Sequence, residues 1–268
     1  DVISFGAAIS SCEKGKQWER ALLLLNRMRE SGMTWDLISL SAALSACEKG
    51  AQWKHALLTL DKMRSAGLTS SVISMNACIS ACGKGGEWEC AQFLLDQMHS
   101  ASMSPDVIAF SAGISACEQN GEWERALSLL DKMRNAAMTS SVISMNAAIS
   151  ACEKGGEWKH AVSLLDKMQN TGMTLTVISI NACISACEKC RQWDRALLLL
   201  SKMHRARMTP SVISFNAGIS AYEKVGQWEH ALSLLDKMIN TGMTLDVVSF
   251  NAAMSACEKG GQWEHALS

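Results

Sequence analysis

Eight tryptophans follow one another along this sequence at a constant spacing of 35 residues, with no insertion between them. They are Trp18, Trp53, Trp88, Trp123, Trp158, Trp193, Trp228 and Trp263. The surrounding residues repeat as well, because VISFNAGISAYEKVGQWEHALSLLDKM (212–238) is matched 35 residues earlier by VISINACISACEKCRQWDRALLLLSKM. A constant period of this length is typical of a solenoid, in which stacked repeats share one continuous core.

The period divides residues 1–268 into a single array of seven full repeats and a truncated eighth. The repeats, numbered 1 to 8 below, start near residues 2, 37, 72, 107, 142, 177, 212 and 247. The sequence opens at a repeat boundary without an initiator methionine and stops inside a repeat at Ser268. We therefore expect a fragment of a longer protein, with any targeting peptide lying upstream.

Within a repeat, apolar residues form two helical stripes separated by a break. The first stripe of repeat 1 consists of Phe5, Ala8, Ile9 and Cys12. The second consists of Trp18, Ala21, Leu22, Leu25 and Met28. This spacing predicts two short helices per repeat, with Ser4 as the cap of the first and Gly32 as a left-handed stop after the second. The chain is therefore predicted to be an all-α solenoid of helix-turn-helix hairpins.

Composition and motifs exclude several functional classes. The net charge of −1 gives no strong field toward nucleic acid or a membrane surface. No apolar run approaches the ~20 residues that cross a bilayer, so we expect no membrane partner. The sequence has no glycine-rich phosphate loop, no Ser/His/Asp arrangement and no HxE motif with a paired CxxC. We therefore expect a chain that is not an enzyme and needs neither a cofactor nor a small-molecule substrate.

Seven of the eleven cysteines occupy one position of the repeat, at which the remaining repeat has Tyr222. They are Cys12, Cys47, Cys82, Cys117, Cys152, Cys187 and Cys257. Because a buried free cysteine behaves as a small hydrophobic residue, we interpret them as core packing. Cys183, Cys187 and Cys190 come closest to metal-ligand spacing, but a zinc site normally needs four ligands and no fourth lies nearby in the sequence. The odd number of cysteines and their spacing also favour free thiols in a reducing compartment.

The tryptophans have two interpretations. They can fill the joint between the two helices of a repeat and the next hairpin, or they can stack on nucleic-acid bases. Their position at the start of the second apolar stripe favours the joint.

The run V-I-S-x-N-A-x-I-S-A-C-E-K-G followed by x-W-x-x-A-L-x-L-L-D-K-M resembles the pentatricopeptide repeat of the P type, and the resemblance covers the whole chain. There are two departures. Tryptophan replaces the usual aliphatic residue at the start of the second helix, and the proline common before each new repeat remains only at Pro105 and Pro210. The resemblance implies a right-handed superhelix that binds single-stranded RNA, one base per repeat, with its amino end toward the 5′ end of the RNA.

By this resemblance, two side chains in each repeat select the base. We call the fifth residue and the last residue of a repeat its selector pair. The pairs are Gly6 with Asp36, Ser41 with Ser71, Asn76 with Asp106, Ser111 with Ser141, Asn146 with Thr176, Asn181 with Ser211, and Asn216 with Asp246, while Asn251 is left without a partner where the sequence stops. The residues alone support this assignment in part, because asparagine is a mediocre helix former yet recurs at five of the eight positions. Its amide can both donate to and accept from a base edge, although a solvated polar stripe explains the pattern too.

The resemblance assigns two further positions. The second residue of each repeat would stack against bases, and these residues are Ile3, Ile38, Ile73, Ile108, Ile143, Ile178, Ile213 and Val248. Lysines at the end of the first helix would contact phosphates, and these are Lys14, Lys49, Lys84, Lys154, Lys189, Lys224 and Lys259, with Gln119 as the exception. The lysines also suit the negative end of a helix dipole, and the glutamate that precedes most of them offsets their charge.

The resemblance therefore implies a sequence-selective RNA-binding module for RNA processing, editing or stabilisation in chloroplasts or mitochondria. Its preferred RNA, by the pairings of the family, would be about seven nucleotides long and resemble 5′-N-A-U-A-Y-C-U-3′. Two alternatives stay open. One is a protein-interaction scaffold of the tetratricopeptide type, and the other is the RNA-guiding part of a protein with a catalytic tail beyond residue 268.

Overall fold

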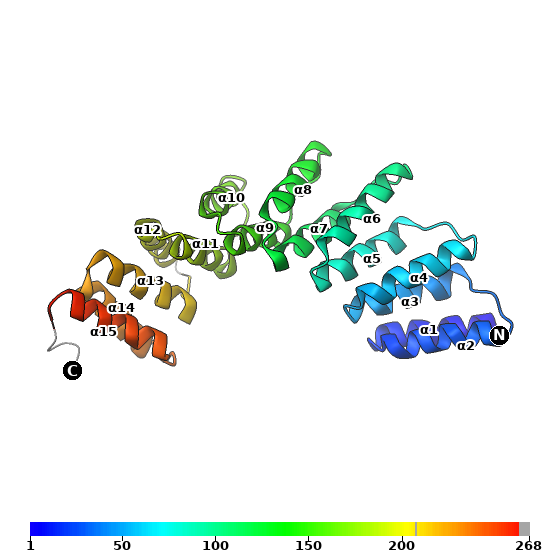
Figure 1. Ribbon diagram of the computed structural model, residues 1–268, viewed down its shortest axis with the longest axis horizontal. Coiled ribbons are helices and arrows are strands. Elements are labelled where there is room, and N and C mark those ends of the chain that lie inside the picture. Colours follow the sequence, from blue (N-terminus) through cyan, green and yellow to red (C-terminus); the bar gives the residue numbers. More distant parts are fainter. Residues whose placement is uncertain (207, 263–268) are drawn as a thin grey trace. The chain divides into compact units, whose positions relative to one another are not determined.

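Each of repeats 1 to 7 folds as a pair of helices, as the spacing of its apolar residues predicts (Figure 1). The computed structural model describes residues 1–206 and 208–262, so Trp263, the last of the regularly spaced tryptophans, lies outside the described residues. The first helices are α1 (Val2–Lys14), α3 (Leu37–Lys49), α5 (Val72–Gly85), α7 (Val107–Asn120), α9 (Val142–Lys154), α11 (Val177–Lys189), α13 (Val212–Val225) and α15 (Val247–Lys259). The second helices are α2 (Trp18–Glu30), α4 (Trp53–Ser65), α6 (Trp88–Ser100), α8 (Trp123–Asn135), α10 (Trp158–Asn170), α12 (Trp193–Arg205) and α14 (Trp228–Asn240).

All regular elements of the described residues are α-helices, which confirms the predicted fold class. None of these helices combines the length and the apolarity needed to cross a membrane.

The helices group into an N-terminal body, Asp1–Ala148, and a C-terminal body, Ile149–Ser268. Within each body, consecutive first helices contact one another: α1 with α3, α3 with α5 and α5 with α7, and then α11 with α13 and α13 with α15. Within the bodies, α2, α4, α6, α12 and α14 are second helices that each contact the first helix of their own repeat and that of the next, as α2 does with α1 and α3. In the described part of each body, neighbouring second helices make no direct backbone contact. The first helices therefore form a continuous layer, and the second helices are spaced apart.

The two apolar stripes meet in a core between the layers. In repeat 2 the fully buried members of the first stripe are Leu40, Ala43, Leu44 and Cys47, and those of the second are Ala56, Leu60 and Met63. Burying each leucine contributes about 1.5–3 kcal/mol, so the stripes supply most of the stability that short helices lack on their own.

The cysteines belong to this core. Cys47 and its equivalents are buried, except that Cys12 in repeat 1 is half-buried. Burial raises the pKa of Cys47 to about 11, so its thiol is neutral at pH 7. Cys183 is buried as well, and among the described residues no three His, Cys, Asp or Glu side chains gather as a metal site requires. Their burial confirms the interpretation of these cysteines as packing residues, whereas Cys12 and Cys190 are half-buried.

The cap of the first helix differs from the sequence prediction. Ser4 is not the cap of α1, because Asp1 caps it instead and accepts a hydrogen bond from the Ser4 backbone N–H at 2.7 Å. The residue before each later repeat does the same for its helix, and these residues are Asp36, Ser71, Asp106, Ser141, Thr176, Ser211 and Asp246. A short polar side chain on extended backbone reaches the N–H three residues later, which a residue already inside the helix cannot do. The last residue of each repeat is thus the helix cap of the next.

The predicted left-handed stops after the second helices are present. Gly32 has φ 75°, and Gly67, Gly172 and Gly242 have φ between 70° and 72°. In repeats 3 and 4 the same position is held by Ser102 and Ala137, both at φ 54°.

Candidate nucleic-acid interface

A row of aliphatic side chains projects into solvent from the first helices. These side chains are the second residues of the repeats, Ile3, Ile38, Ile73, Ile108, Ile143, Ile178, Ile213 and Val248, and their exposed fractions run from 59% to 82%. We call them the aliphatic row. Leaving a large aliphatic side chain in water forgoes about 1.5–3 kcal/mol of burial energy, so fold stability does not explain the row. A repeated apolar surface of this kind suits a repeated ligand.

In repeats 3, 6 and 7 a hydrogen bond joins the two members of the selector pair. The amide Nδ2 of Asn76 donates to Oδ2 of Asp106 at 2.9 Å. The Nδ2 atoms of Asn181 and Asn216 donate to Ser211 Oγ and Asp246 Oδ2, each also at 2.9 Å. Residues 30 positions apart meet because the last residue caps the next first helix, which lies directly beside the helix that carries the fifth residue. The structure thus brings together the two positions that the resemblance singled out.

Three other selector pairs have a fifth residue with a short side chain or none, namely Gly6, Ser41 and Ser111. In the described residues, no hydrogen bond joins the members of the pairs Gly6–Asp36, Ser41–Ser71 and Ser111–Ser141. Their last residues still accept the N–H bond of the helix that they cap. Asn146 lies in the N-terminal body and Thr176 in the C-terminal body, where Thr176 caps α11. Asn251 is exposed on α15.

In the C-terminal body, the predicted site residues line a shallow hollow of about 470 Å³ over α11, α13 and α15. Ile213 and Val248 of the aliphatic row line it together with Asn216, and Glu188 and Glu223 line its other side. Ile213, Asn216 and Glu223 occupy one face of α13, because residues three, four and seven apart share a face of a helix. The residues predicted to stack on a base and to select it therefore lie on the same face of α13 as the charged Glu223.

The lysines that end the first helices are exposed, but most are paired with glutamates. Lys49 Nζ lies 2.8 Å from Glu13 Oε1, Lys84 3.1 Å from Glu48, Lys189 3.0 Å from Glu153, and Lys259 2.6 Å from Glu223. Each glutamate belongs to the preceding repeat, 36 residues earlier, and Lys224 also lies 3.1 Å from Glu223. Lys14 and Lys154 are exposed at the equivalent positions. A phosphate that approaches a paired lysine competes with a carboxylate.

Two carboxylates at the hollow have lowered pKa values. Burial alone would raise the pKa of Glu223, but hydrogen bonds from Lys259, Lys224 and Ser255 lower it overall. The hydroxyl and backbone N–H of Ser249 lower the pKa of Asp246, and Asn216 adds to the effect. Both groups are ionised at neutral pH, so each can only accept hydrogen bonds.

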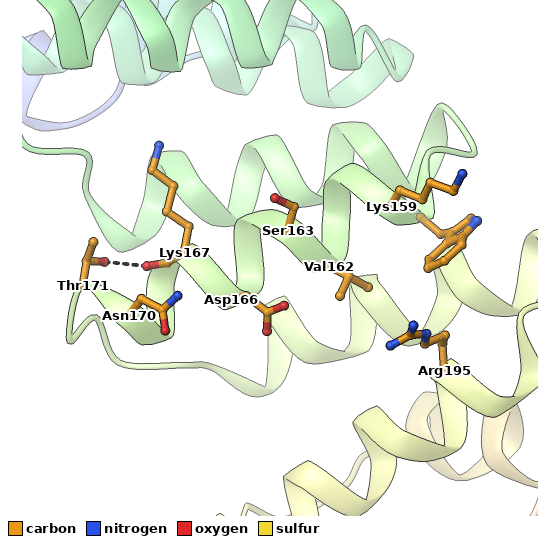
Figure 2. A pocket seen from close by; sticks show the side chains of 9 residues that line it. Lys159, Val162, Ser163, Asp166, Lys167, Asn170, Thr171 and Arg195 are labelled. Atoms are coloured by element: carbon orange, nitrogen blue, oxygen red, sulfur yellow. Dashed lines mark hydrogen bonds between the residues drawn. The ribbon is translucent and has the colours of Figure 1, made fainter.

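The tryptophans lie at the starts of the second helices, whereas the selector pairs lie on the first helices. Figure 2 shows side chains of α10 lining a groove of about 520 Å³, with Arg195 contributed by α12; Trp158 also lines it. Trp18 lines the equivalent groove between α2 and α4. The backbone of Gly50 in repeat 2 lies so close to Trp18 that an added Cβ would be 2.5 Å from Trp18 Cδ1. Gly85 approaches Trp53 and Gly260 approaches Trp228 in the same way, which confirms that these tryptophans fill the joint between consecutive hairpins, although they are half-buried rather than fully enclosed.

Sequence reasoning missed the third residue of the repeats. Six serines at this position are buried and contact the residue that caps their own helix: Ser39, Ser74, Ser144, Ser179, Ser214 and Ser249. Ser4 is exposed and Ala109 replaces the serine in repeat 4. The signal was present as a recurring Asp, Ser or Thr followed three residues later by Ser, which is a variant of the capping box.

Sequence models of one repeat family match most of the chain. The pentatricopeptide repeat domain matches residues 23–85, 93–155 and 163–225. The PPR repeat matches residues 3–33, 73–103 and 143–173, and the PPR repeat family matches residues 210–259. No curated protein sequence matches the chain.

Several solved structures share the fold. The crystal structure of the pentatricopeptide repeat protein PPR10 from maize has a TM-score of 0.58 at 20% identity, covering 98% of this chain and 47% of that one. PPR10 in complex with an 18-nt psaJ RNA element has a TM-score of 0.51 at 18% identity, covering 99% and 49%. The PPR domain of Arabidopsis thaliana protein-only RNase P 1, in complex with tRNA, has a TM-score of 0.58 at 11% identity, covering 72% and 98%.

The chain spans about half the length of PPR10. The structural likenesses establish the fold of stacked helical hairpins, and the sequence models cover more than half of the residues. The chain belongs to the pentatricopeptide repeat family.

Proposed function

We propose that the chain binds single-stranded RNA and selects its sequence, one base per repeat, without chemistry of its own. The observation that carries this proposal is the position of a hydrogen-bonded selector pair between two members of the aliphatic row. In repeat 7, Ile213 and Val248 line the same hollow as Asn216, which is bonded to Asp246. A base inserted between two aliphatic side chains turns its Watson–Crick edge toward such a pair.

Two structural neighbours support the class of ligand. PPR10 is described in complex with an 18-nt psaJ RNA element, and the PPR domain of protein-only RNase P 1 is described in complex with tRNA. The extension of RNA binding to this chain is our inference from the shared family and from the aliphatic row.

The chemistry of the last residue supports the choice of base. Asp246 is an ionised acceptor, which suits the N3–H of uracil and repels the N3 lone pair of cytosine. Ser211 carries a hydroxyl that can donate to N3 of cytosine. With the weaker preferences of the other pairs, the proposed RNA is 5′-N-A-U-A-Y-C-U-3′, in which repeat 6 meets cytosine and repeat 7 meets uracil.

We assign the lysines at the ends of the first helices to phosphate contacts. Their glutamate partners make this contribution weaker than a row of unpaired lysines would provide, because binding must first separate or outcompete the ion pairs. An exposed ion pair is worth only about 0–1 kcal/mol, so a phosphate can displace it.

Selection from a random RNA pool tests the proposal, run on the wild-type protein and on Ser211→Asp. We expect the sixth nucleotide of the enriched sequence to change from cytosine to uracil, with a shift in discrimination of ~1–3 kcal/mol. Ser233→Asp adds the same charge on the exposed face of α14 and serves as the matched control, which should leave the sequence unchanged. Failure of the wild-type protein to enrich any sequence would reject RNA selection. A change spread over several nucleotides would reject the register of one base per repeat.

We further propose a role in organellar RNA processing, editing or stabilisation, in chloroplasts or mitochondria. Family membership supports it. Recovery of RNA bound to the full-length protein from purified organelles tests it, and recovery of such RNA only from the cytosol contradicts it.

A further inference from the structure

Ser214, the third residue of repeat 7, is fully buried and contacts both members of the Asn181–Ser211 pair. Its hydroxyl donates to Oδ1 of Asn181 at 2.7 Å. Ser214 Oγ also accepts the backbone N–H of Ser211 at 2.8 Å and lies 3.2 Å from Ser211 Oγ. Both ends of the Asn181 amide are therefore engaged, Oδ1 by Ser214 and Nδ2 by Ser211.

The orientation of the Asn181 amide decides what Ser211 can offer to a base. With Oδ1 held by Ser214, Nδ2 faces Ser211, and the Ser211 oxygen accepts that bond. The single hydrogen of the Ser211 hydroxyl is then not taken by Asn181, and it can turn from Ser214 Oγ, 3.2 Å away, to an incoming acceptor such as N3 of cytosine. In the opposite orientation Oδ1 would face Ser211 and take that hydrogen, which would leave the pair without a donor hydroxyl for the base.

The Asn–Asp pairs show that an aspartate orients the asparagine amide without a contact from the serine at the third position. At the pair of repeat 7, the hydroxyl of Ser249 from repeat 8 donates to Oδ1 of Asp246 at 2.6 Å, and Asn216 Nδ2 donates to Oδ2 of Asp246 at 2.9 Å. At the pair of repeat 3, the residue equivalent to Ser249 is Ala109 of repeat 4, yet Asn76 donates to Asp106 at the same 2.9 Å. A carboxylate accepts only, so it repels the amide oxygen and fixes the amide by itself.

Ser214 donates its hydroxyl hydrogen to an asparagine side chain. Serines at the same position donate to a backbone carbonyl instead where the neighbouring selector pair has serine as its fifth residue. Ser74 donates to the backbone carbonyl of Ser71 at 2.8 Å, and Ser144 donates to that of Ser141 at 2.9 Å. The selector pairs that these two serines adjoin belong to the preceding repeats, and the fifth residues of those pairs are Ser41 and Ser111. The contact is therefore associated with an Asn–Ser pair rather than with capping alone.

We propose that Ser214 is a positioning residue for base choice in repeat 6, which fixes the amide of Asn181 so that Ser211 presents its hydroxyl hydrogen to the base. Ser214 is buried and acts through Asn181 rather than by touching RNA. The proposal rests on the proposed function, and it adds a third residue to the determinants of specificity at an Asn–Ser pair.

The test compares Ser214→Ala with Ser249→Ala in the complete chain. Dissociation constants are measured for synthetic RNAs of the proposed sequence that carry each of the four bases at the sixth or the seventh nucleotide. Ser214→Ala should reduce the preference for cytosine over uracil at the sixth nucleotide by about tenfold, within the range for one base-edge contact. Ser249→Ala should leave the preference for uracil at the seventh nucleotide within about twofold, as Ala109 indicates.

The double variant Ser211→Asp with Ser214→Ala separates positioning from damage to the fold. It reproduces the Asn76–Asp106–Ala109 combination, so it should select uracil at the sixth nucleotide as sharply as Ser211→Asp alone. An unselective double variant overturns the proposal, because the loss would then come from a disturbed helix start. Cytosine preference retained within twofold by Ser214→Ala overturns it too. A wild-type protein without any base preference overturns the proposed function itself, and with it the role of Ser214.

Discussion

The first and second helices alternate along the same chain, yet they form different kinds of layer. Within each body, neighbouring first helices contact one another directly, while neighbouring second helices make no backbone contact in the described residues. The first layer holds the selector pairs in register, because each pair combines a side chain of one helix with the cap of the next. The second layer closes the core from the other side and leaves grooves between its members.

The exposed side chains of the two layers differ in regularity. The aliphatic row of the first helices is present in all eight repeats. On the second helices, Leu23, Leu58 and Phe93 are exposed at one position, but Ser128 and Ser163 take that position in later repeats. A ligand that repeats with the protein requires the same side chain in every repeat, so the comparison favours the first layer as the binding surface.

The largest expected effect comes from forcing the first helices apart. A Cβ on Gly83 of α5 would lie 2.6 Å from the backbone oxygen of Ala112 in α7. Gly83→Ala should therefore lower the free energy of unfolding by about 1–3 kcal/mol, the usual cost of overpacking. Urea unfolding followed by circular dichroism measures it. Gly6→Ala is the control, because a Cβ there meets nothing within 4 Å, and equal stability of the two variants would contradict the close contact of the first layer.

A smaller effect is expected on RNA affinity when the aliphatic row is interrupted. Ile178→Ser should weaken binding of the proposed RNA by about fivefold, or ~1 kcal/mol, at the low end of stacking contributions. Leu198→Ser on α12 is the matched control, since Leu198 is 54% exposed and Ile178 is 65% exposed. Fluorescence anisotropy measures both. If the control weakens binding as much as Ile178→Ser, the assignment of the ligand to the first layer is wrong.

Releasing a lysine from its glutamate should change the salt dependence of binding. Glu48→Gln removes the partner of Lys84, so Lys84 becomes free to meet a phosphate. The slope of log affinity against log salt should steepen by about 0.7, the value for one additional single-strand phosphate contact. Asp131→Asn removes a similar ion pair with Arg134 on α8 and should leave the slope unchanged. An unchanged slope for Glu48→Gln would remove Lys84 from the phosphate contacts.

The smallest effect concerns acid stability. The folded pKa of Glu223 is lowered from its ordinary 4.5, so its ion pairs stabilise the fold above that value and are lost as the pH falls through the folded pKa. The wild-type protein should exceed Glu223→Gln in stability at about pH 6.5, and the difference should vanish near pH 3. Thermal melting of both proteins at the two pH values measures it. A difference that grows on acidification would contradict the sign of the pKa change.

The sequence was sufficient for the hairpins because a period of 35 residues and two apolar stripes leave few alternatives. Burial of the cysteines and the joint filled by Trp18 followed from the same stripes. The selector pairs were assigned from resemblance, since the residues alone also allowed a solvated polar stripe. Contacts between repeats could not be derived in this way. The pairing of Lys84 with Glu48 depends on how successive helices stack, and the role of Ser214 depends on which end of an amide it meets.

The residue that ends each repeat also caps the next helix, and this restricts which residue types can occupy the last position of a repeat. Aspartate, serine and threonine occupy every such position, from Asp1 to Asp246. Replacing a capping residue with one that cannot cap costs ~0.5–2 kcal/mol. Repeated along the array, that loss becomes comparable to the ~5–15 kcal/mol that holds an ordinary domain together. The choice of residue at the end of a repeat is therefore limited first by the requirements of helix capping, before any requirement of a ligand.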